Sequence, residues 1–141
     1  MMRYLLPLFL TYLLISCGNT SSEANEMNLS GTIQGLKKGT LLLQTATDST
    51  YETIDSLKIN GEASFQFTTQ VENPQVYYLY LREQDGAFKE RITFFGEPGD
   101  IVVNTSLSKF GIDQKISGSE NQVIYEDYKK LSKNSSARNF F

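Results

Sequence analysis

The chain has 141 residues with a formal net charge of −3, 40% hydrophobic and 12% aromatic content, values typical of one globular domain rather than of a disordered chain. It has no histidine, and Cys17 is its only cysteine, which excludes His-dependent catalytic triads, His or Cys metal sites and CxxC redox pairs. No basic patch stands out, which argues against nucleic-acid binding.

Residues 1–16 are predicted to be a signal peptide. Arg3 supplies a positive charge, and residues 4–15 form an apolar run of 12 residues. As a helix this run would be about 18 Å long at about 1.5 Å per residue, which is short of a hydrocarbon core of about 30 Å. The run therefore fits a signal peptide better than a membrane span.

The leader ends in Leu14-Ile15-Ser16-Cys17, which resembles the lipobox of bacterial lipoproteins. The resemblance implies cleavage between Ser16 and Cys17, a diacylglyceryl group on the Cys17 sulfur and an acyl group on the new amino terminus. Two or three such chains hold a protein stably at a membrane. The alternative is an ordinary secretory signal with a chance cysteine, and we favour lipidation because the chain has no other cysteine.

Residues 17–26 are predicted to be a lipidated cysteine followed by a flexible polar tether. Position +2 is Gly18 rather than Asp, so the inner-membrane retention signal of enteric bacteria is absent. We therefore expect a cell-envelope protein anchored to the outer membrane of a Gram-negative bacterium, facing the periplasm or the surface.

The folded domain is expected over residues 27–117 and is predicted to be mainly β. Residues 27–33 alternate between apolar and polar, residues 40–44 form a second short strand, and residues 51–59 a third. In the third strand Tyr51 is in phase with Leu57 and Ile59 but Ile54 is not. This mismatch predicts a bulge or a break near Asp55.

Three turn motifs separate the remaining strands. Asn60-Gly61 fits a two-residue hairpin turn that would pair residues 57–59 with 63–67, Asp85-Gly86 marks the next turn, and Pro98-Gly99 fits a type II turn. Between them, residues 76–81 are apolar or aromatic throughout, as expected of a central strand covered on both sides. Residues 101–103 and 112–116 are the last predicted strands.

A helix is predicted over residues 118–133, followed by a polar tail over residues 134–141. Ser119 and Gln122 match a capping box. Ile124, Tyr128 and Leu131 form one apolar stripe at helical spacing.

Because the turns join successive strands and no helix lies between strands, we expect antiparallel pairing and no parallel sheet. The predicted architecture is an antiparallel β-sandwich or partly open barrel of about seven or eight strands with a C-terminal α-helix.

Four segments in order resemble one family: NLSGTIQGLKKG at 28–39, TIDSLKINGEASFQF at 53–67, ITFFGEPGDIVV at 92–103 and GSENQVIYEDY at 118–128. This is similar to the domain of unknown function numbered 4369, common in Bacteroidetes lipoproteins. The resemblance implies a β-rich module without assigned chemistry that often precedes a thioredoxin-like domain. No cysteine follows Cys17, so the redox activity is not carried over.

Ser49 and Ser56 each follow an aspartate in a pattern that resembles the Bacteroidetes O-glycosylation motif. The alternative, which we favour, is that these Asp-Ser pairs form a turn and a strand start. Gly31, Gly35 and Gly39 lack the spacing of a phosphate loop and are interpreted as turn and bulge glycines.

Carboxylates and aromatic rings are the other candidate site residues. Four acids are expected near one end of the sheet, where a pair could run glycoside hydrolysis or bind calcium, although solvated charges are the favoured interpretation: Glu83, Asp85, Glu90 and Glu97. Five aromatic residues occupy neighbouring strands. On an exposed face they would stack on sugars or bind a partner, and on inner faces they would form core, which we favour: Tyr77, Tyr78, Tyr80, Phe94 and Phe95.

We therefore expect a non-enzymatic, lipid-anchored lipoprotein whose β module binds an envelope protein or glycan, with no metal and no cofactor besides the lipid on Cys17. The alternative is the N-terminal fragment of a larger thioredoxin-like thiol-disulfide oxidoreductase that lacks its catalytic domain. A hydrolase that uses carboxylates alone is the third hypothesis.

Overall fold

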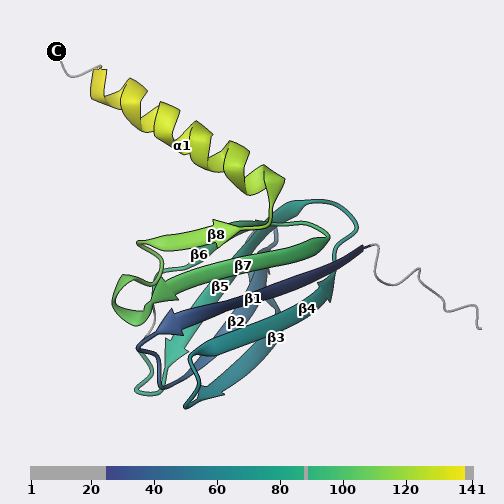
Figure 1. The fold of residues 1–141 in the computed structure, drawn as a ribbon, viewed down its shortest axis with the longest axis vertical. Helices are drawn as coiled ribbons and strands as arrows, with labels where there is room; N and C mark the ends of the chain where they lie inside the picture. The colour runs from purple at the N-terminus through teal and green to yellow at the C-terminus, as the bar shows by residue number, and fades with distance from the viewer. Residues whose placement is uncertain (1–24, 88, 139–141) are drawn as a thin grey trace, which may run out of the picture.

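The computed structural model describes residues 25–87 and 89–138. They form a sandwich of two sheets with a helix that projects from one end (Figure 1). The predicted signal peptide and lipidation site, including Ser16 and Cys17, lie outside the described residues. The elements are β1 (Glu26–Gln34), β2 (Lys38–Ala46), β3 (Tyr51–Asn60), β4 (Ser64–Gln70), β5 (Gln75–Glu83), β6 (Ile92–Gly96), β7 (Gly99–Ser106), the 3₁₀ turn η2 (Leu107–Lys109), β8 (Gln114–Ser117) and α1 (Glu120–Arg138).

Sheet A has the strand order β4-β1-β7-β8 and sheet B has the order β3-β2-β5-β6. The prediction of a mainly β sandwich with a C-terminal helix is confirmed. The prediction of antiparallel pairing throughout is wrong, because β1 and β7 run parallel, with Leu29 opposite Ile101. A parallel pair needs a long connection, and here that connection is the whole of sheet B and β4.

Two of the three turn motifs carry the chain from one sheet to the other instead of closing hairpins. The predicted pairing across Asn60-Gly61 is wrong, because β3 pairs with β2 while β4 pairs with β1. A type I′ turn needs a positive φ at both central residues. Gly61 has a φ of +107° but the φ of Asn60 is not positive, so this turn is not formed. The Gly61 N–H instead donates to the Lys37 carbonyl oxygen at 2.8 Å. Pro98-Gly99 likewise links β6 of sheet B to β7 of sheet A.

The Asp85-Gly86 motif does join two paired strands, β5 and β6. Gly86 has a φ of +82°, and the Asp85 carboxylate accepts a hydrogen bond from the Ala87 N–H at 2.9 Å. This turn prediction is confirmed.

The predicted bulge in β3 is confirmed and lies at Ile54. Leu43 pairs with Asp55 while the next residue, Gln44, pairs with Thr53, so Ile54 has no partner on β2. An extra residue reverses the side-chain alternation of a strand. Tyr51 therefore lies on the opposite face from Leu57 and Ile59, and the expectation that the three share a face is wrong.

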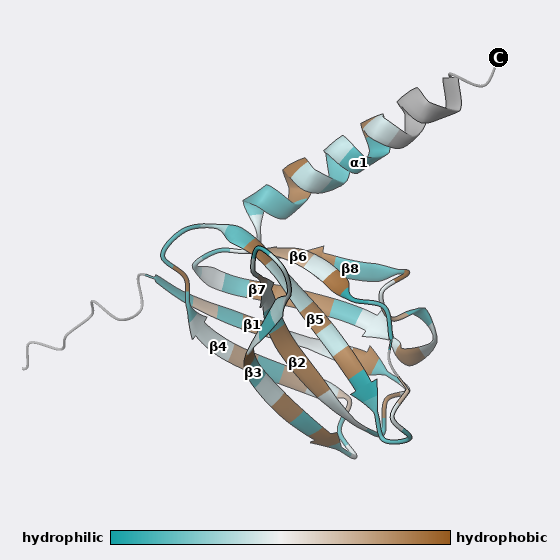
Figure 2. Cartoon of the chain, turned by 180° about the vertical axis from the view of Figure 1, so that it is seen from behind, coloured by the Kyte–Doolittle hydropathy of each residue, from teal (hydrophilic) through white to brown (hydrophobic). Residues whose placement is uncertain are grey.

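The core lies between the two sheets and is formed by the inward residues of both, together with residues of the connecting loops. Its fully buried members include Met27, Leu29, Ile33, Leu41, Leu43, Tyr77, Leu79, Leu81, Ile92, Phe94, Ile101 and Val103. Sheet B alternates between hydrophobic and hydrophilic residues along its strands (Figure 2). The prediction that β5 is covered on both sides is wrong in one respect: Tyr77 and Leu79 are buried, but Tyr78 and Tyr80 are only half-buried.

Helix α1 begins after Ser119, whose Oγ accepts a hydrogen bond from the Gln122 N–H at 3.1 Å, so the predicted N-cap is present. The Gln122 side chain does not complete a capping box. It is buried and its Oε1 accepts a hydrogen bond from the Phe95 N–H of β6 at 3.0 Å. The helix is longer than the expected segment 118–133, and its predicted apolar stripe does not pack on the sandwich. Ile124, Tyr128 and Leu131 are each more than 60% exposed.

Candidate functional site

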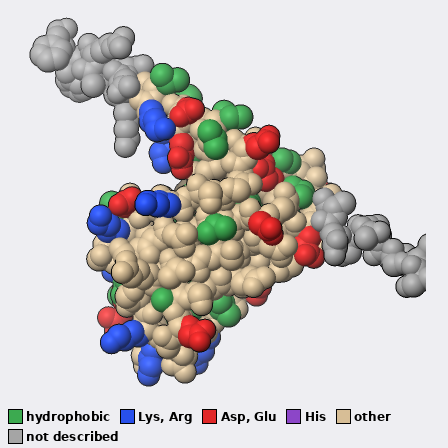
Figure 3. Space-filling model, in the orientation of Figure 1, with side chains coloured by type: hydrophobic (Ala, Val, Ile, Leu, Met, Phe, Trp, Pro, Cys, Tyr) green, Lys and Arg blue, Asp and Glu red, His purple; other side chains and the backbone are tan. Residues whose placement is uncertain are grey.

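The outward faces of the two sheets differ in chemistry. On sheet A the outward positions are mostly uncharged and polar, as the tan side chains over β1, β4 and β7 in Figure 3 show. They are Glu26, Asn28, Ser30, Thr32, Gln34, Ser64, Gln66, Thr68, Gln70, Asp100, Val102, Asn104, Ser106, Lys115 and Ser117.

On sheet B the outward positions carry aromatic rings and cations and no carboxylate. They are Lys38, Thr40, Leu42, Gln44, Ala46, Tyr51, Thr53, Ser56, Lys58, Asn60, Val76, Tyr78, Tyr80, Arg82, Thr93 and Phe95. Since the chain as a whole is acidic, this exclusion of carboxylates makes the outer face of sheet B the candidate site.

A cluster of three tyrosines and one arginine lies across this face, from the edge strand β3 to the residue before the opposite edge strand β6. We call Tyr51, Tyr78, Tyr80 and Arg91 the tyrosine–arginine cluster. The guanidinium carbon of Arg91 lies 4.0 Å from the Tyr51 ring centroid and 4.3 Å from that of Tyr80. The Tyr51 and Tyr78 rings meet edge to face, with centroids 4.9 Å apart. The cation is thus held against two aromatic rings.

The buried Gln44 on β2 holds the Arg91 side chain of this cluster through a hydrogen bond. Its side chain is 6% exposed, its Oε1 accepts a hydrogen bond from Arg91 Nε at 3.2 Å, and its Nε2 donates to Thr53 Oγ1 at 3.1 Å. An open depression of about 420 Å³ lies beside the cluster, lined also by Lys89, Glu90 and Thr93. Three strands and the residue before β6 therefore orient the rings and the guanidinium group before any ligand arrives.

A row of cations lies at the other end of the same face. Thr40 on β2 pairs with Lys58 on β3 and with Arg82 on β5, so the two cations flank one residue. Lys38 lies two residues away from Thr40 on the same face. We call Lys38, Lys58 and Arg82 the basic end. A second depression of about 420 Å³ is lined by these residues together with Gly39, Thr40, Ile59, Asn60, Glu83 and Gln84.

The structure separates the aromatic residues predicted from the sequence. Tyr77 and Phe94 stack in the core with centroids 5.8 Å apart, as favoured. Tyr78, Tyr80 and Phe95 face outward, and for these the core interpretation is wrong. Phe95 contacts the Tyr125 ring of α1 at 5.4 Å, which leaves the two tyrosines for the site.

Two residues of the cluster, Tyr51 and Arg91, were missed by the sequence analysis. The bulge at Ile54 was the available signal for Tyr51, because one extra residue turns this ring outward. Arg91 has no local signal, because its partners come from three other strands.

The four acids do not gather at one end of the sheet. Glu83 is the last residue of β5, and Asp85 and Glu90 lie in the β5–β6 connection, whereas Glu97 follows the far end of β6. Glu83 pairs with Lys89 at 3.1 Å, and the Glu97 carboxylate accepts hydrogen bonds from the Glu120 N–H and the Asn121 side chain at the start of α1. The expectation that all four lie at one end is wrong, because Glu97 follows the end of β6 that is far from the other three acids.

The serines and glycines singled out in the sequence have distinct places. Ser49 is exposed in the β2–β3 turn and Ser56 is exposed on the outer face of sheet B, where glycosylation of either stays a prediction. Gly35 has a φ of +86° in a turn, as expected. Gly31 and Gly39 instead lie within strands, and a Cβ on Gly31 would come 1.8 Å from the Val103 carbonyl oxygen.

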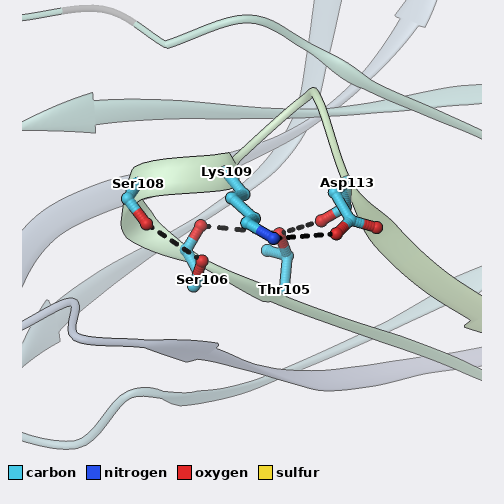
Figure 4. Close-up of polar contacts among 5 residues, drawn as sticks. All are labelled: Thr105, Ser106, Ser108, Lys109 and Asp113. Atoms are coloured by element: carbon cyan, nitrogen blue, oxygen red, sulfur yellow. Dashed lines mark hydrogen bonds and ion pairs between the residues drawn. The ribbon is translucent and has the colours of Figure 1, made fainter.

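A second polar cluster closes the β7–β8 connection (Figure 4). Thr105 Oγ1 donates to the Asp113 carbonyl oxygen at 2.8 Å, Lys109 Nζ pairs with the Asp113 carboxylate at 3.3 Å, and the hydroxyls of Ser106 and Ser108 are 3.2 Å apart. Because these groups bond to one another, we interpret this cluster as support for the β7–β8 connection and not as a candidate site.

Within residues 25–87 and 89–138, no group of three or more acidic or thiol side chains could hold a metal ion. No helix in that same part of the chain combines the length and the apolar character that a membrane span requires.

A comparison with family models matches residues 27–125 to the family described as a domain of unknown function, DUF4369. The match covers more than half of the chain, and the chain belongs to this family. The resemblance found in the four sequence segments is confirmed. No curated protein matches the chain, and no solved structure matches it.

Proposed function

We propose that this chain is a lipid-anchored, non-enzymatic lipoprotein of the cell envelope whose DUF4369 domain binds a partner through the outer face of sheet B. The observation that carries the binding function is the contrast between the two faces. One sandwich surface is polar and mostly uncharged, while the other holds an ordered tyrosine–arginine cluster and a basic end.

The sequence supports the anchored location. The apolar leader ends at Ser16-Cys17, and the acyl chains on Cys17 would hold the mature protein at the membrane. The polar residues that follow, up to the start of β1 at Glu26, form the tether to the domain. An outer-membrane location agrees with Gly18 at the second mature position.

The order within the face supports binding. Exposed side chains usually lose rotamer freedom when a ligand binds, and that loss weakens affinity. Here the buried Gln44 and two rings already hold the Arg91 guanidinium group in place. A ligand at this face would therefore meet groups that are already oriented.

Thiol accessibility in native envelopes tests this function without knowledge of the partner. The Asn60→Cys variant places a thiol at the basic end, and the matched Ser64→Cys variant places one on the outer face of sheet A. Both positions are exposed. Maleimide labelling of the purified full chain in detergent is compared with labelling in intact envelopes, with the parent chain as the blank.

We expect envelopes to slow labelling of the Asn60→Cys variant at least fivefold and to leave the Ser64→Cys variant unchanged. Equal labelling of both variants in both settings would contradict a partner at sheet B.

A second candidate function is that of the amino-terminal part of a larger thioredoxin-like oxidoreductase. The exposed stripe on α1 favours it, since Ile124, Tyr128 and Leu131 would gain burial against a following domain. Sequencing the DNA downstream of the Phe141 codon tests this candidate. A continuation that encodes a CxxC domain supports it, and a stop codon in every frame with no such domain contradicts it.

A further inference from the structure

We propose that the outer face of sheet B binds an anionic polysaccharide, meaning a chain of sugars that carry carboxylate or sulfate groups. This inference rests on the proposed function and names its ligand class.

The charge distribution on the outer face of sheet B favours an anionic ligand. Lys38, Lys58 and Arg82 are exposed, and Arg91 is half-buried on the same side. One acid lines each depression but neither is at an outward strand position: Glu83, at the basic depression, is paired with Lys89, and Glu90, at the aromatic depression, lies in the loop before β6. A face with several cations and no outward carboxylate attracts anions and repels cations.

The tyrosine rings on this face favour a sugar as the ligand. Tyrosine rings offer an apolar surface together with a hydroxyl group, which suits the apolar faces and hydroxyls of a sugar. Tyr51 is 42% exposed, and Tyr78 and Tyr80 are half-buried beside it. Arg91 lies against two of these rings, and a guanidinium group can recognise a carboxylate or sulfate through two parallel hydrogen bonds.

The shape of this face favours a polymeric ligand over a single small molecule. The aromatic and basic depressions are both open, and they lie along one face of the same strands. From Lys38 to Ala46, β2 extends about 27 Å at about 3.4 Å per residue, room for several sugars in a row. Thr40 lines the basic depression, and Ser56 and Thr53 follow on β3 toward Tyr51, so hydroxyl groups that can bond to sugar hydroxyls continue along the face.

The aliphatic residues on this face are few. At the outward positions of sheet B in the described part of the chain they are Leu42, Ala46 and Val76. Because tyrosine and arginine are also enriched in protein interfaces, an acidic peptide is the competing ligand in the test below.

Binding of the full chain, purified in detergent, tests the inference. The probes are polygalacturonate, hyaluronate and chondroitin sulfate, with fully methyl-esterified polygalacturonate as the uncharged match and polyglutamate as the acidic peptide match. The variants are Lys58→Gln/Arg82→Gln and Tyr51→Leu, with Lys115→Gln on the outer face of sheet A as control. Circular dichroism checks that each variant is folded.

We expect at least one anionic polysaccharide to bind at least tenfold more tightly than the methyl ester and than polyglutamate. The Lys58→Gln/Arg82→Gln variant should weaken that binding at least tenfold and Tyr51→Leu at least threefold, while Lys115→Gln leaves it unchanged. Higher salt should weaken it further, because exposed charges are screened.

Equal binding of the methyl ester, equal binding of polyglutamate, or binding of none of the three polysaccharides would overturn this inference. The proposed function is judged separately by thiol protection in envelopes, so protection at Asn60 without polysaccharide binding would contradict the ligand class alone.

Discussion

The guanidinium carbon of Arg91 lies 4.0 Å from the ring centroid of Tyr51, although the two residues come from opposite edges of sheet B. The contact bridges the outward positions of β2 and β5, which lie between them. It depends on the bulge at Ile54, because without this extra residue the Tyr51 side chain would point to the other face. A local irregularity in one edge strand thus completes a cluster that spans four strands.

Arg91 contributes to stability as well as to the site. We expect Arg91→Met to lower the free energy of unfolding by about 1–2 kcal/mol, because it removes the cation–π contacts and a hydrogen bond to the buried Gln44. The matched Arg82→Met change, at an exposed position, should stay within about 0.5 kcal/mol. Urea unfolding measures both, and equal effects would contradict the assigned contacts.

Gly31 is required by close packing inside sheet A. An added Cβ would meet the Val103 carbonyl oxygen at 1.8 Å and the Phe65 ring at 2.8 Å, so the parallel β1–β7 pair would have to separate. We expect Gly31→Ala to cost about 3 kcal/mol or more. The neighbouring, exposed Thr32→Ala change should cost about 1 kcal/mol or less. A thermal midpoint for Gly31→Ala equal to that of Thr32→Ala would refute this packing.

Gln122 attaches α1 to the edge of sheet B. Its Oε1 accepts the Phe95 N–H, a donor on the edge strand β6. We expect Gln122→Leu to raise the hydrogen-exchange rate of the Phe95 amide about tenfold, equivalent to about 1.4 kcal/mol. The Gln122 Nε2 also donates to the Glu126 carboxylate, so the control is Gln122→Glu/Glu126→Gln, which keeps both hydrogen bonds and should preserve protection. An unchanged Phe95 rate in Gln122→Leu would show that the helix is not held by this bond.

Cys17 carries the anchor in our proposal. We expect the wild-type chain to incorporate labelled palmitate and to sediment with membranes after a high-salt wash. The Cys17→Ala variant should incorporate none, since the chain has no second cysteine. Palmitate incorporation by the Cys17→Ala variant would contradict lipidation at this residue.

Local sequence signals predicted the local parts of the fold. Alternation predicted the strands, Asp85-Gly86 predicted the β5–β6 hairpin, and the phase of Ile54 predicted the bulge. The pairing across Asn60-Gly61 could not be predicted in this way. A turn motif shows where the chain reverses, but the next strand joins whichever sheet gives its apolar side the better burial.

The parallel β1–β7 pair is a similar case, because Leu29 and Ile101 are far apart in the sequence. The candidate site was predicted only in part for the same reason. Tyr78 and Tyr80 stood out as neighbours on one strand, whereas Arg91 joins them only through the register of sheet B.

The most direct test of the central claim combines occupancy with the chemistry of the face. The Asn60→Cys thiol is labelled in intact envelopes with and without the Lys58→Gln/Arg82→Gln changes. If the cations hold a partner over sheet B, the changes will raise the envelope labelling rate to that of the purified chain. If the thiol stays equally protected after both cations are removed, the outer face of sheet B is not the binding surface described here.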